Sequence, residues 1–163
     1  MTETSPPNCA HCGGETRHTR GEEIYPHRPD LAFLHFYRCD SCDAHVGCHG
    51  ETKRPLGNPA NKELRRLRND VHRVLDPIWE NALDIYPGGK DERGRKIIRH
   101  AARARTYAFL ADRLGISKKK CHTAMFDAET CRAAIEILTG LTYRRVRAWA
   151  KAQKLKKEIE DAR

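Results

Sequence analysis

The sequence has no long apolar run. None reaches eighteen residues, so nothing in it predicts a transmembrane helix. Its first residues, MTETSPPNCAHC, lack both the basic n-region and the apolar core of a signal peptide. Internal repeats and long low-complexity segments are absent as well. The 163 residues suit one domain of ordinary size, or a small metal module joined to a helical one, and we expect a cytoplasmic protein with no membrane contact and no small-molecule cofactor.

The cysteines are the clearest signal that is present. There are seven, and four of them form two C-x2-C pairs. An odd number with such pairs is typical of thiolate metal ligands in a reducing compartment rather than of a secreted disulfide framework. Four thiolates on two tight turns can each bind one Zn²⁺ at about 2.3 Å and leave no open position, which defines a structural site. We predict one structural zinc ion bound by Cys9, Cys12, Cys39 and Cys42, with an iron–sulfur centre or a redox dithiol as the alternatives.

The pattern of the whole chain predicts an α+β fold, a small N-terminal zinc β-ribbon followed by a mainly α-helical region with a basic C-terminal helix. Alternation and aromatic content favour strands at residues 16–25, 33–38 and 44–47. The proline-rich segment KRPLGNPAN, residues 53–61, is interpreted as a linker. The expected organisation is a disordered segment 1–8, a zinc-ribbon domain with its linker 9–60, a helical domain 61–141 and a basic helix 142–163.

Five helices are expected after residue 60, and the last of them is the basic helix 142–163. Asn61 is the predicted N-cap of the first, and Asp76-Pro77 should interrupt it and start a second, short helix. YPGGKDERG, residues 86–94, is a predicted loop, and a helix over 95–114 should end at Gly115. Asp127 should cap a further helix that ends at Gly140. The apolar residues that mark these helices are, in chain order, Leu64, Leu67, Val71, Val74, Ile78, Trp79, Leu83, Ile97, Ala101, Ala104, Ala108 and Ala111. In the helix that starts at Asp127, Cys131, Ile135 and Leu138 should face inward.

Charge is unevenly distributed along the chain. Residues 1–60 carry six Lys or Arg against eight Asp or Glu, a net −2, whereas residues 61–163 carry twenty-five against fourteen, a net +11. The C-terminal part is therefore the candidate for contact with a polyanion, although a basic composition can also serve solubility alone. The candidate nucleic-acid-binding residues are Arg95, Arg99, Arg103, Lys118, Lys119, Lys120, Arg144, Arg147, Lys151 and Lys154.

YAFLADRLGISKKKCH, residues 107–122, also resembles the first helix, the turn and the start of the second helix of a helix-turn-helix. In that interpretation Ala108, Leu114 and Ile116 face the core and the three lysines lie near a nucleic-acid backbone. The second helix would be only about two turns long, because FDAET begins a new helix soon afterwards.

Histidines allow two further hypotheses. His49, Asn61 and His72 follow the order of a His-Asn-His nuclease, with a general base, an orienting amide and a ligand for a divalent ion. Both C-x2-C pairs precede His49 here, whereas in many such nucleases a C-x2-C pair flanks the final histidine of the motif. Cys48-His49 and Cys121-His122, with Cys131, could form a second metal site, but small buried cysteines beside polar histidines are the favoured interpretation.

Several segments resemble the zinc-finger-containing proteins encoded by bacteriophages and prophages. These segments are CAHCGG, then YRCDSCDAHVGCHG with PLGNPAN, and finally CHTAMFD, and the resemblance covers about residues 9–138. It implies a zinc-binding ribbon joined to helices in an infected bacterial cytoplasm. Residue by residue it supports the four cysteines of the two C-x2-C pairs as ligands, and it implies no catalytic residue.

We expect a zinc-ribbon protein that binds DNA or RNA mainly through phosphate contacts. The alternatives are a phage-encoded interaction or inhibitor protein that docks on a host enzyme or defence complex, and the metal-dependent nuclease.

Overall fold

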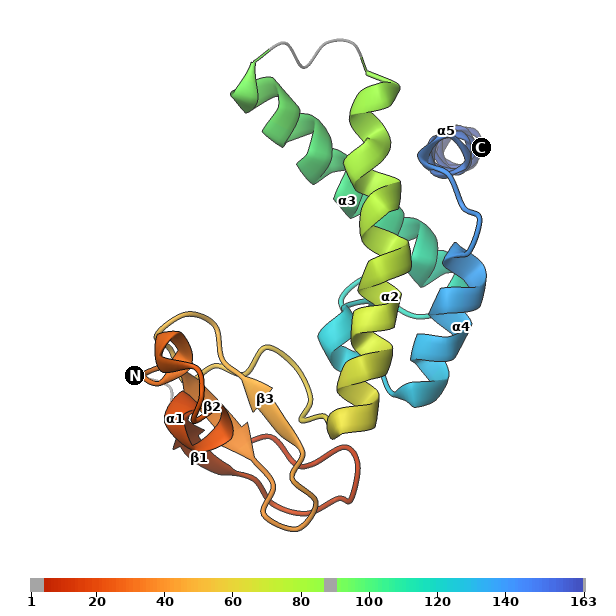
Figure 1. Ribbon diagram of the computed structural model, residues 1–163. Coiled ribbons are helices and arrows are strands. Elements are labelled where there is room, and N and C mark those ends of the chain that lie inside the picture. Colours follow the sequence, from red (N-terminus) through yellow and green to blue (C-terminus); the bar gives the residue numbers. More distant parts are fainter. Residues whose placement is uncertain (1–4, 87–90, 163) are drawn as a thin grey trace. The chain divides into compact units, whose positions relative to one another are not determined.

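The computed structural model describes residues 5–86 and 91–162. The chain forms two compact units. Unit 1 contains the residues up to Arg68 together with Ala124–Asp127, and unit 2 contains Asn69–Thr123 and the residues from Ala128 onward. The predicted α+β class is confirmed, since a small sheet is followed by helices (Figure 1). In the described part of the chain, no helix has both the length and the apolar character needed to cross a membrane. The predicted disorder of residues 1–8 falls partly outside the described residues.

Unit 1 is built on a three-stranded antiparallel sheet in the order β1-β2-β3. The strands are β1 (Arg17–Arg20), β2 (His35–Arg38) and β3 (His45–Gly47). Phe36 lies in the centre, opposite Thr19 on one side and Gly47 on the other. Phe36, Tyr37 and Val46 are all buried, with Phe36 on one face of the sheet and the paired Tyr37 and Val46 on the other. Three strands were predicted, and all three are present.

The first strand is shorter than predicted. The chain turns at Gly21 into one helical turn, α1 (Gly21–Ile24), followed by a 3-10 turn, η1 (Pro29–Leu31). A Cβ at Gly21 would lie 1.8 Å from the Leu31 carbonyl oxygen, so only glycine allows this close return of the backbone. The expectation of a strand through residue 25 was therefore wrong, because a tertiary contact at Gly21 decides where the strand ends.

The segment predicted to be a linker is folded onto unit 1. Isolated bridges pair Cys48 with Pro55 and His45 with Ala60. Gly57, Pro59 and Ala60 are buried. Prolines and a glycine do prevent a regular element here, as predicted, but backbone pairing with the sheet holds the segment in place.

The helix α2 (Lys62–Glu80) begins as predicted and continues further than predicted. Asn61 Oδ1 accepts a hydrogen bond from the Leu64 amide at 2.9 Å, which confirms the N-cap. The predicted break at Asp76-Pro77 is wrong, because Pro77 lies inside the helix. Asp76 braces this turn by accepting hydrogen bonds from Trp79 Nε1 at 3.0 Å and from His72 Nδ1 at 3.3 Å. The chain after α2 forms a 3-10 turn, η2 (Asn81–Asp84), where the second helix was expected.

The helix α3 (Glu92–Leu114) is the centre of unit 2 and contacts η2, α4 and α5. It ends at Gly115, whose φ is 65°, as predicted. It starts three residues earlier than predicted, since Asp91 Oδ1 caps it by accepting from the Gly94 amide. Its buried face is Ala102, Thr106, Phe109, Leu110 and Ala111. The predicted stripe was wrong at Ile97, which is 61% exposed, and at Ala104, because the unit buries the larger Phe109 and Leu110 instead.

The last two helices are α4 (Ala128–Leu138) and α5 (Tyr143–Asp161). The inward positions of Cys131 and Leu138 and the left-handed Gly140 after α4 are as predicted. The helix-turn-helix prediction is wrong. After Gly115 the chain forms a turn over the three lysines and a 3-10 turn, η3 (Thr123–Met125), so thirteen residues separate α3 from α4 where that motif has three or four.

Candidate zinc centre and basic surface

Two turns of the same shape carry the four paired cysteines. In the first, the Cys9 amide donates to the Gly14 carbonyl at 2.8 Å, and in the second the Cys39 amide donates to the Ala44 carbonyl at 2.8 Å. Each turn passes through a left-handed residue directly after its second cysteine, Gly13 in the first and Asp43 in the second. This conformation folds the chain back so that both thiols of a pair point to the same side.

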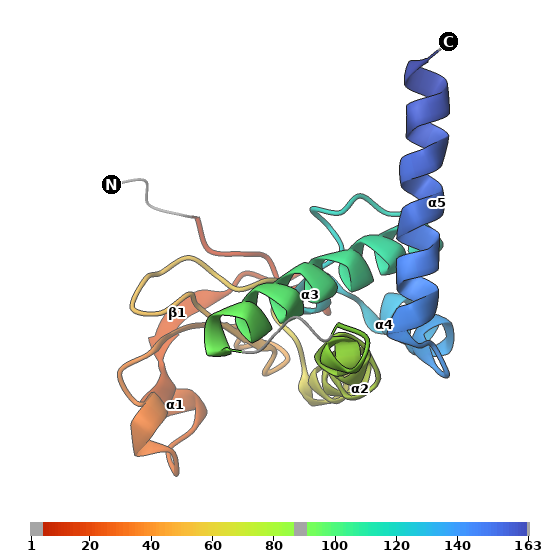
Figure 2. The same cartoon turned by 90° about the horizontal axis from the view of Figure 1, so that it is seen from above.

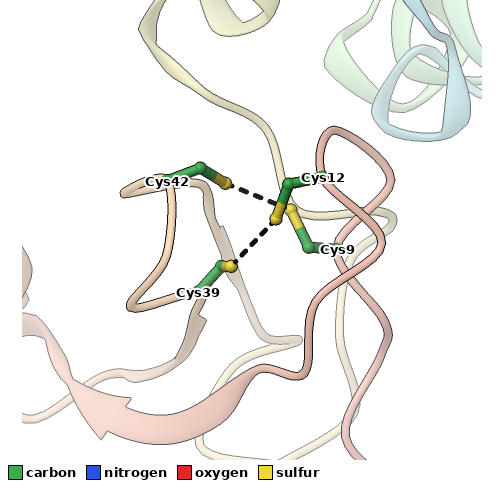
Figure 3. A group of neighbouring side chains, drawn as sticks. All are labelled: Cys9, Cys12, Cys39 and Cys42. Atoms are coloured by element: carbon green, nitrogen blue, oxygen red, sulfur yellow. Dashed lines mark hydrogen bonds between the residues drawn. The ribbon is translucent and has the colours of Figure 1, made fainter.

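The four sulfur atoms lie close together and face one another (Figure 3). All lie within 4.8 Å of one another. The closest approaches are 3.4 Å between Cys9 and Cys42 and 3.4 Å between Cys12 and Cys39. None of the four is in a disulfide. A zinc tetrahedron with bonds of about 2.3 Å has sulfur–sulfur edges of about 3.8 Å, which lies inside the observed range.

The surroundings of the sulfurs suit thiolate ligands. Cys9 and Cys39 are 2% and 0% exposed and pack with Ala44. A Cβ at Gly14 would lie 3.3 Å from Cys12 Sγ and 3.6 Å from Cys39 Sγ, so this glycine leaves room for the sulfurs. Burial raises the pKa of Cys42 to about 12. Burial acts in the same direction on Cys39, but the Cys12 thiol and the amides of Ser41 and Cys42 lower its pKa to about 7. Amides that donate to sulfur favour the ionised form that zinc requires.

The donor set, its closed arrangement and the glycine cradle define a zinc-binding protein, in which one ion can be held by Cys9, Cys12, Cys39 and Cys42. The chain belongs to the DUF3268 family, described as a zinc-finger-containing domain, whose model matches residues 5–140. No curated protein and no solved structure matches this chain. The matched segment ends before α5 begins.

The proposed second metal site does not assemble in the described residues, where the four-cysteine group alone brings three or more His, Cys, Asp or Glu ligands together. Cys48 is half-buried, and burial raises the pKa of its thiol. Cys121 is buried as well, which raises the pKa of its thiol to about 11. Cys131 is fully buried in α4. Thiols in apolar surroundings stay protonated and serve as small packing groups.

The three residues of the nuclease hypothesis lie in a turn, at the start of α2 and within α2. His49 is exposed in a turn, where its amide donates to the Arg54 carbonyl at 2.9 Å. Asn61 caps α2, as described above. His72 lies 3.3 Å from Asp76, one turn further along the same helix. The roles of Asn61 and His72 in the structure are therefore those of a helix cap and of a brace within a helix.

The predicted basic residues of α3 differ in their surroundings. Arg95 forms an ion pair with Glu92 at 3.0 Å, and the guanidinium of Arg103 lies over the Tyr107 ring at 5.4 Å from its centroid. Arg99 is exposed. The three lysines that follow the helix, Lys118, Lys119 and Lys120, are exposed in a turn.

The predicted basic residues of α5 line a groove of about 570 Å³ between this helix, α3 and the end of η2. Arg144, Arg147, Lys151 and Lys154 come from α5, at steps of three and four that place them on one face. Sequence analysis missed Arg105 and Tyr86, which complete the groove. Arg105 lies only two positions from Arg103 and so was not part of the predicted stripe, and nothing local marks Tyr86, which precedes the expected loop.

Contacts within the groove position two of its arginines. Arg147 lies over the Tyr86 ring at 4.5 Å from its centroid, and Arg105 donates to the Tyr143 hydroxyl at 3.0 Å. None of the described residues that line the groove carries a carboxylate. Within residues 5–86 and 91–162, Arg144, Arg147 and Lys151 have no ion-pair partner, whereas Lys154 lies 3.6 Å from Glu158. The groove is therefore strongly cationic.

Two arginines of the zinc ribbon, Arg17 and Arg38, are in the opposite situation. Arg17 pairs with Glu23 and with Asp40, the latter at 2.8 Å. Arg38 pairs with Glu23 at 2.9 Å and with Asp43 at 2.6 Å. The Arg17 guanidinium, helped by the Thr19 hydroxyl, lowers the pKa of Glu23 to about 2. These carboxylates neutralise Arg17 and Arg38, whereas Arg20 of β1 donates to the Phe33 carbonyl instead.

Proposed function

We propose that this zinc-binding protein binds nucleic acid, DNA or RNA, mainly through phosphate contacts in the groove between α3 and α5. The observation that carries the proposal is the lining of that groove by five cationic side chains, Arg105, Arg144, Arg147, Lys151 and Lys154, with no carboxylate among its lining residues. Cations without carboxylate partners break no ion pair when they contact phosphate, and the release of condensed counterions from the nucleic acid favours binding.

The shape of the groove supports a linear polyanion. Its cations follow α5 for about three turns, and Figure 2 shows that this helix projects beyond the rest of unit 2. A row of cations along one helix face can follow successive phosphates, while a compact ligand would contact only part of it. Arginines dominate the part nearest α3, where their planar groups can bind phosphate oxygens in pairs.

The zinc centre acts as a scaffold in this proposal, because its four thiolates leave no position for a substrate. Phage or prophage origin and a bacterial cytoplasmic location, which the resemblance implies, would make phage nucleic acid the natural ligand. The predicted α3 residues Arg99 and Arg103 and the lysines after α3 would then add outer phosphate contacts.

A salt titration with paired charge variants tests the proposal. Affinity for a mixed-sequence DNA or RNA should fall steeply with salt, and Arg144→Gln with Arg147→Gln should weaken binding and reduce the slope of log K against log salt by about 2. Lys156→Gln with Lys157→Gln is the matched control, since it removes the same charge from α5 outside the groove. Equal losses in both double variants would show that net charge, and not the groove, carries the binding.

Two other outcomes redirect the interpretation. A loss confined to Arg99→Gln with Arg103→Gln would move the interface to α3. No retention on nucleic acid at low salt, together with a protein partner that survives nuclease treatment, would contradict the proposal and favour the docking function.

A further inference from the structure

A second hollow lies against the base of α5, lined by residues that do not line the cationic groove. It has a volume of about 350 Å³ and is lined by Phe109 and Arg113 of α3, Ile137 of α4, Thr139 and Leu141 of the following turn, and Arg145 and Trp149 of α5. Arg144 faces the groove and Arg145 faces this hollow, because successive residues of a helix point about 100° apart. We name the hollow the Trp149 pocket.

Two aromatic rings give the Trp149 pocket a fixed wall. The rings of Phe109 and Trp149 lie 5.5 Å apart and meet at 89°. Phe109 is buried and Trp149 is half-buried, so the indole presents part of its surface to solvent. Trp149 Nε1 donates to Asp112 Oδ2 at 3.1 Å, which fixes the orientation of the indole. A ring held in this way can stack on another flat group without first losing side-chain freedom.

Two arginines, Arg113 and Arg145, are among the residues that line the Trp149 pocket. The Arg113 guanidinium lies 5.1 Å from the Phe109 centroid, and Arg145 forms part of the lining. Neither arginine has an ion-pair partner in the described part of the chain. The nearby carboxylate of Asp112 is hydrogen-bonded to the indole. Apolar walls, a half-buried indole and two cations together suit a flat aromatic group that is joined to an anion, which is the chemistry of a nucleotide.

We infer that the Trp149 pocket takes one unpaired base of a single-stranded nucleic acid, which stacks on Trp149 while Arg113 and Arg145 bind its neighbouring phosphates. This inference rests on the proposed function, because the groove on α5 supplies most of the phosphate contacts. Bases inside a duplex are stacked on their neighbours and cannot reach such a pocket, whereas those of a single strand can. The protein should therefore prefer single strands to duplexes.

Fluorescence of Trp149 provides a direct test. The chain has two tryptophans, so the Trp79→Phe variant leaves Trp149 as the sole emitter. A thymidine oligonucleotide of about 15 residues, added at low salt, should quench this emission in step with binding measured by anisotropy. A duplex of the same length should bind more weakly and leave the emission unchanged, because its bases do not reach the indole.

Substitution of the indole separates stacking from charge. Trp149→Ala should lower the affinity for the single strand by roughly 5- to 150-fold and leave duplex binding unchanged, and Trp149→Phe should restore most of the loss. If Trp149→Ala does not fold, Arg113→Gln with Arg145→Gln replaces it, and the ratio of single-strand to duplex affinity should fall in this variant.

The outcomes distinguish the two proposals. Absence of binding to any nucleic acid overturns the proposed function and this inference together. Binding without quenching, or with equal affinity for duplex and single strand, overturns this inference alone. Saturable quenching by free thymidine monophosphate at the same concentration as the oligonucleotide would show a site for free nucleotides, which also contradicts a strand-binding pocket.

Discussion

Gly13 and Asp43 adopt the same left-handed backbone conformation, with φ of 74° and 57°, each directly after the second cysteine of its pair. The first turn uses the residue best suited to this conformation, and the second uses an aspartate, one of the few other residues that accept it. Asp43 also forms an ion pair with Arg38. The two roles of Asp43, backbone conformation and charge, can be separated by substitution.

Substituting Asp43 should affect stability mainly through the backbone. Asp43→Gly should be close to neutral, whereas Asp43→Val should cost about 1 to 3 kcal/mol, because a β-branched residue fits the left-handed region poorly. Urea unfolding of the zinc-loaded protein measures the difference. Asp40→Val is the control, since Asp40 also pairs with an arginine but has no positive φ. Equal losses at positions 40 and 43 would contradict the backbone explanation.

Removal of one thiolate should abolish the zinc centre. We expect one zinc ion per chain. The Cys39→Ser variant should lose this ion and with it much of the folding free energy that a structural zinc contributes, which is about 10 kcal/mol or more. Metal analysis and thermal unfolding before and after chelation measure both effects. Cys48→Ser is the matched control, because Cys48 is half-buried in the same unit but lies outside the ligand group, and it should retain the metal. A folded, zinc-free wild type after long chelation would refute the prediction.

Stability should fall on mild acidification because of two histidines. His18 Nε2 and His35 Nδ1 share a hydrogen bond of 2.7 Å across β1 and β2. Burial lowers the pKa of both imidazoles from the usual 6.5. The positive charges of Arg20 and Lys53 lower both values further, and the neighbouring His35 lowers the pKa of His18. Glu51 opposes the shift at His35. The unfolded chain therefore binds protons first, so the stabilising contribution is complete above about pH 6.5 and is lost as the pH falls through the lowered values.

Comparison of variants separates the effect of this histidine pair on stability from the effect of zinc release at low pH. The double variant His18→Gln with His35→Gln should show a flatter dependence of unfolding free energy on pH between about pH 5 and 7 than the wild type. The exposed His27→Gln is the control and should follow the wild type. If the double variant shows the same pH dependence as the wild type, the pair does not contribute to it.

Gly57 holds the 53–61 segment against residues 124–127. A Cβ at Gly57 would lie 2.3 Å from the Ala124 carbonyl oxygen, and the Asn58 amide donates to that same oxygen at 3.0 Å. Gly57→Ala must displace one backbone from the other and should cost about 1 to 3 kcal/mol in urea unfolding. Gly47→Ala is the control, because a Cβ there would meet only side-chain atoms, at 3.4 Å or more. No difference between the two variants would contradict a tight contact at residue 57.

Arg68 completes this contact. Its guanidinium donates to the Asn58 carbonyl at 2.9 Å and to the Phe126 carbonyl at 2.8 Å, so one side chain joins two segments far apart in the chain. The sequence marks Arg68 only as one of several charged positions on an amphipathic helix, and it marks 53–61 as a stretch without regular structure. Neither feature predicts the contact, because it depends on which backbone carbonyls lie near the side chain after folding.

The domain division at residues 60 and 141 stays a prediction. Compact units defined by contacts are not the same as segments that fold independently, and α2 continues through the end of unit 1. The positions of Asn61 and Gly115 were predictable, since a cap depends on its own side chain or backbone freedom and on the next few residues. Pro77 was not, because residue type alone does not show that Asp76 braces this turn through His72 and Trp79.

Residue type and short spacing were enough to predict the four cysteines that can hold zinc, the α+β class, the helix boundaries at Asn61 and Gly115 and the basic character of α5. Three other features depend on how the chain packs: Gly21 ends a strand, Arg105 and Tyr86 join the cations of α5, and the rings of Phe109 and Trp149 meet. Those relationships join residues from separate elements, and packing rather than local preference sets which faces meet.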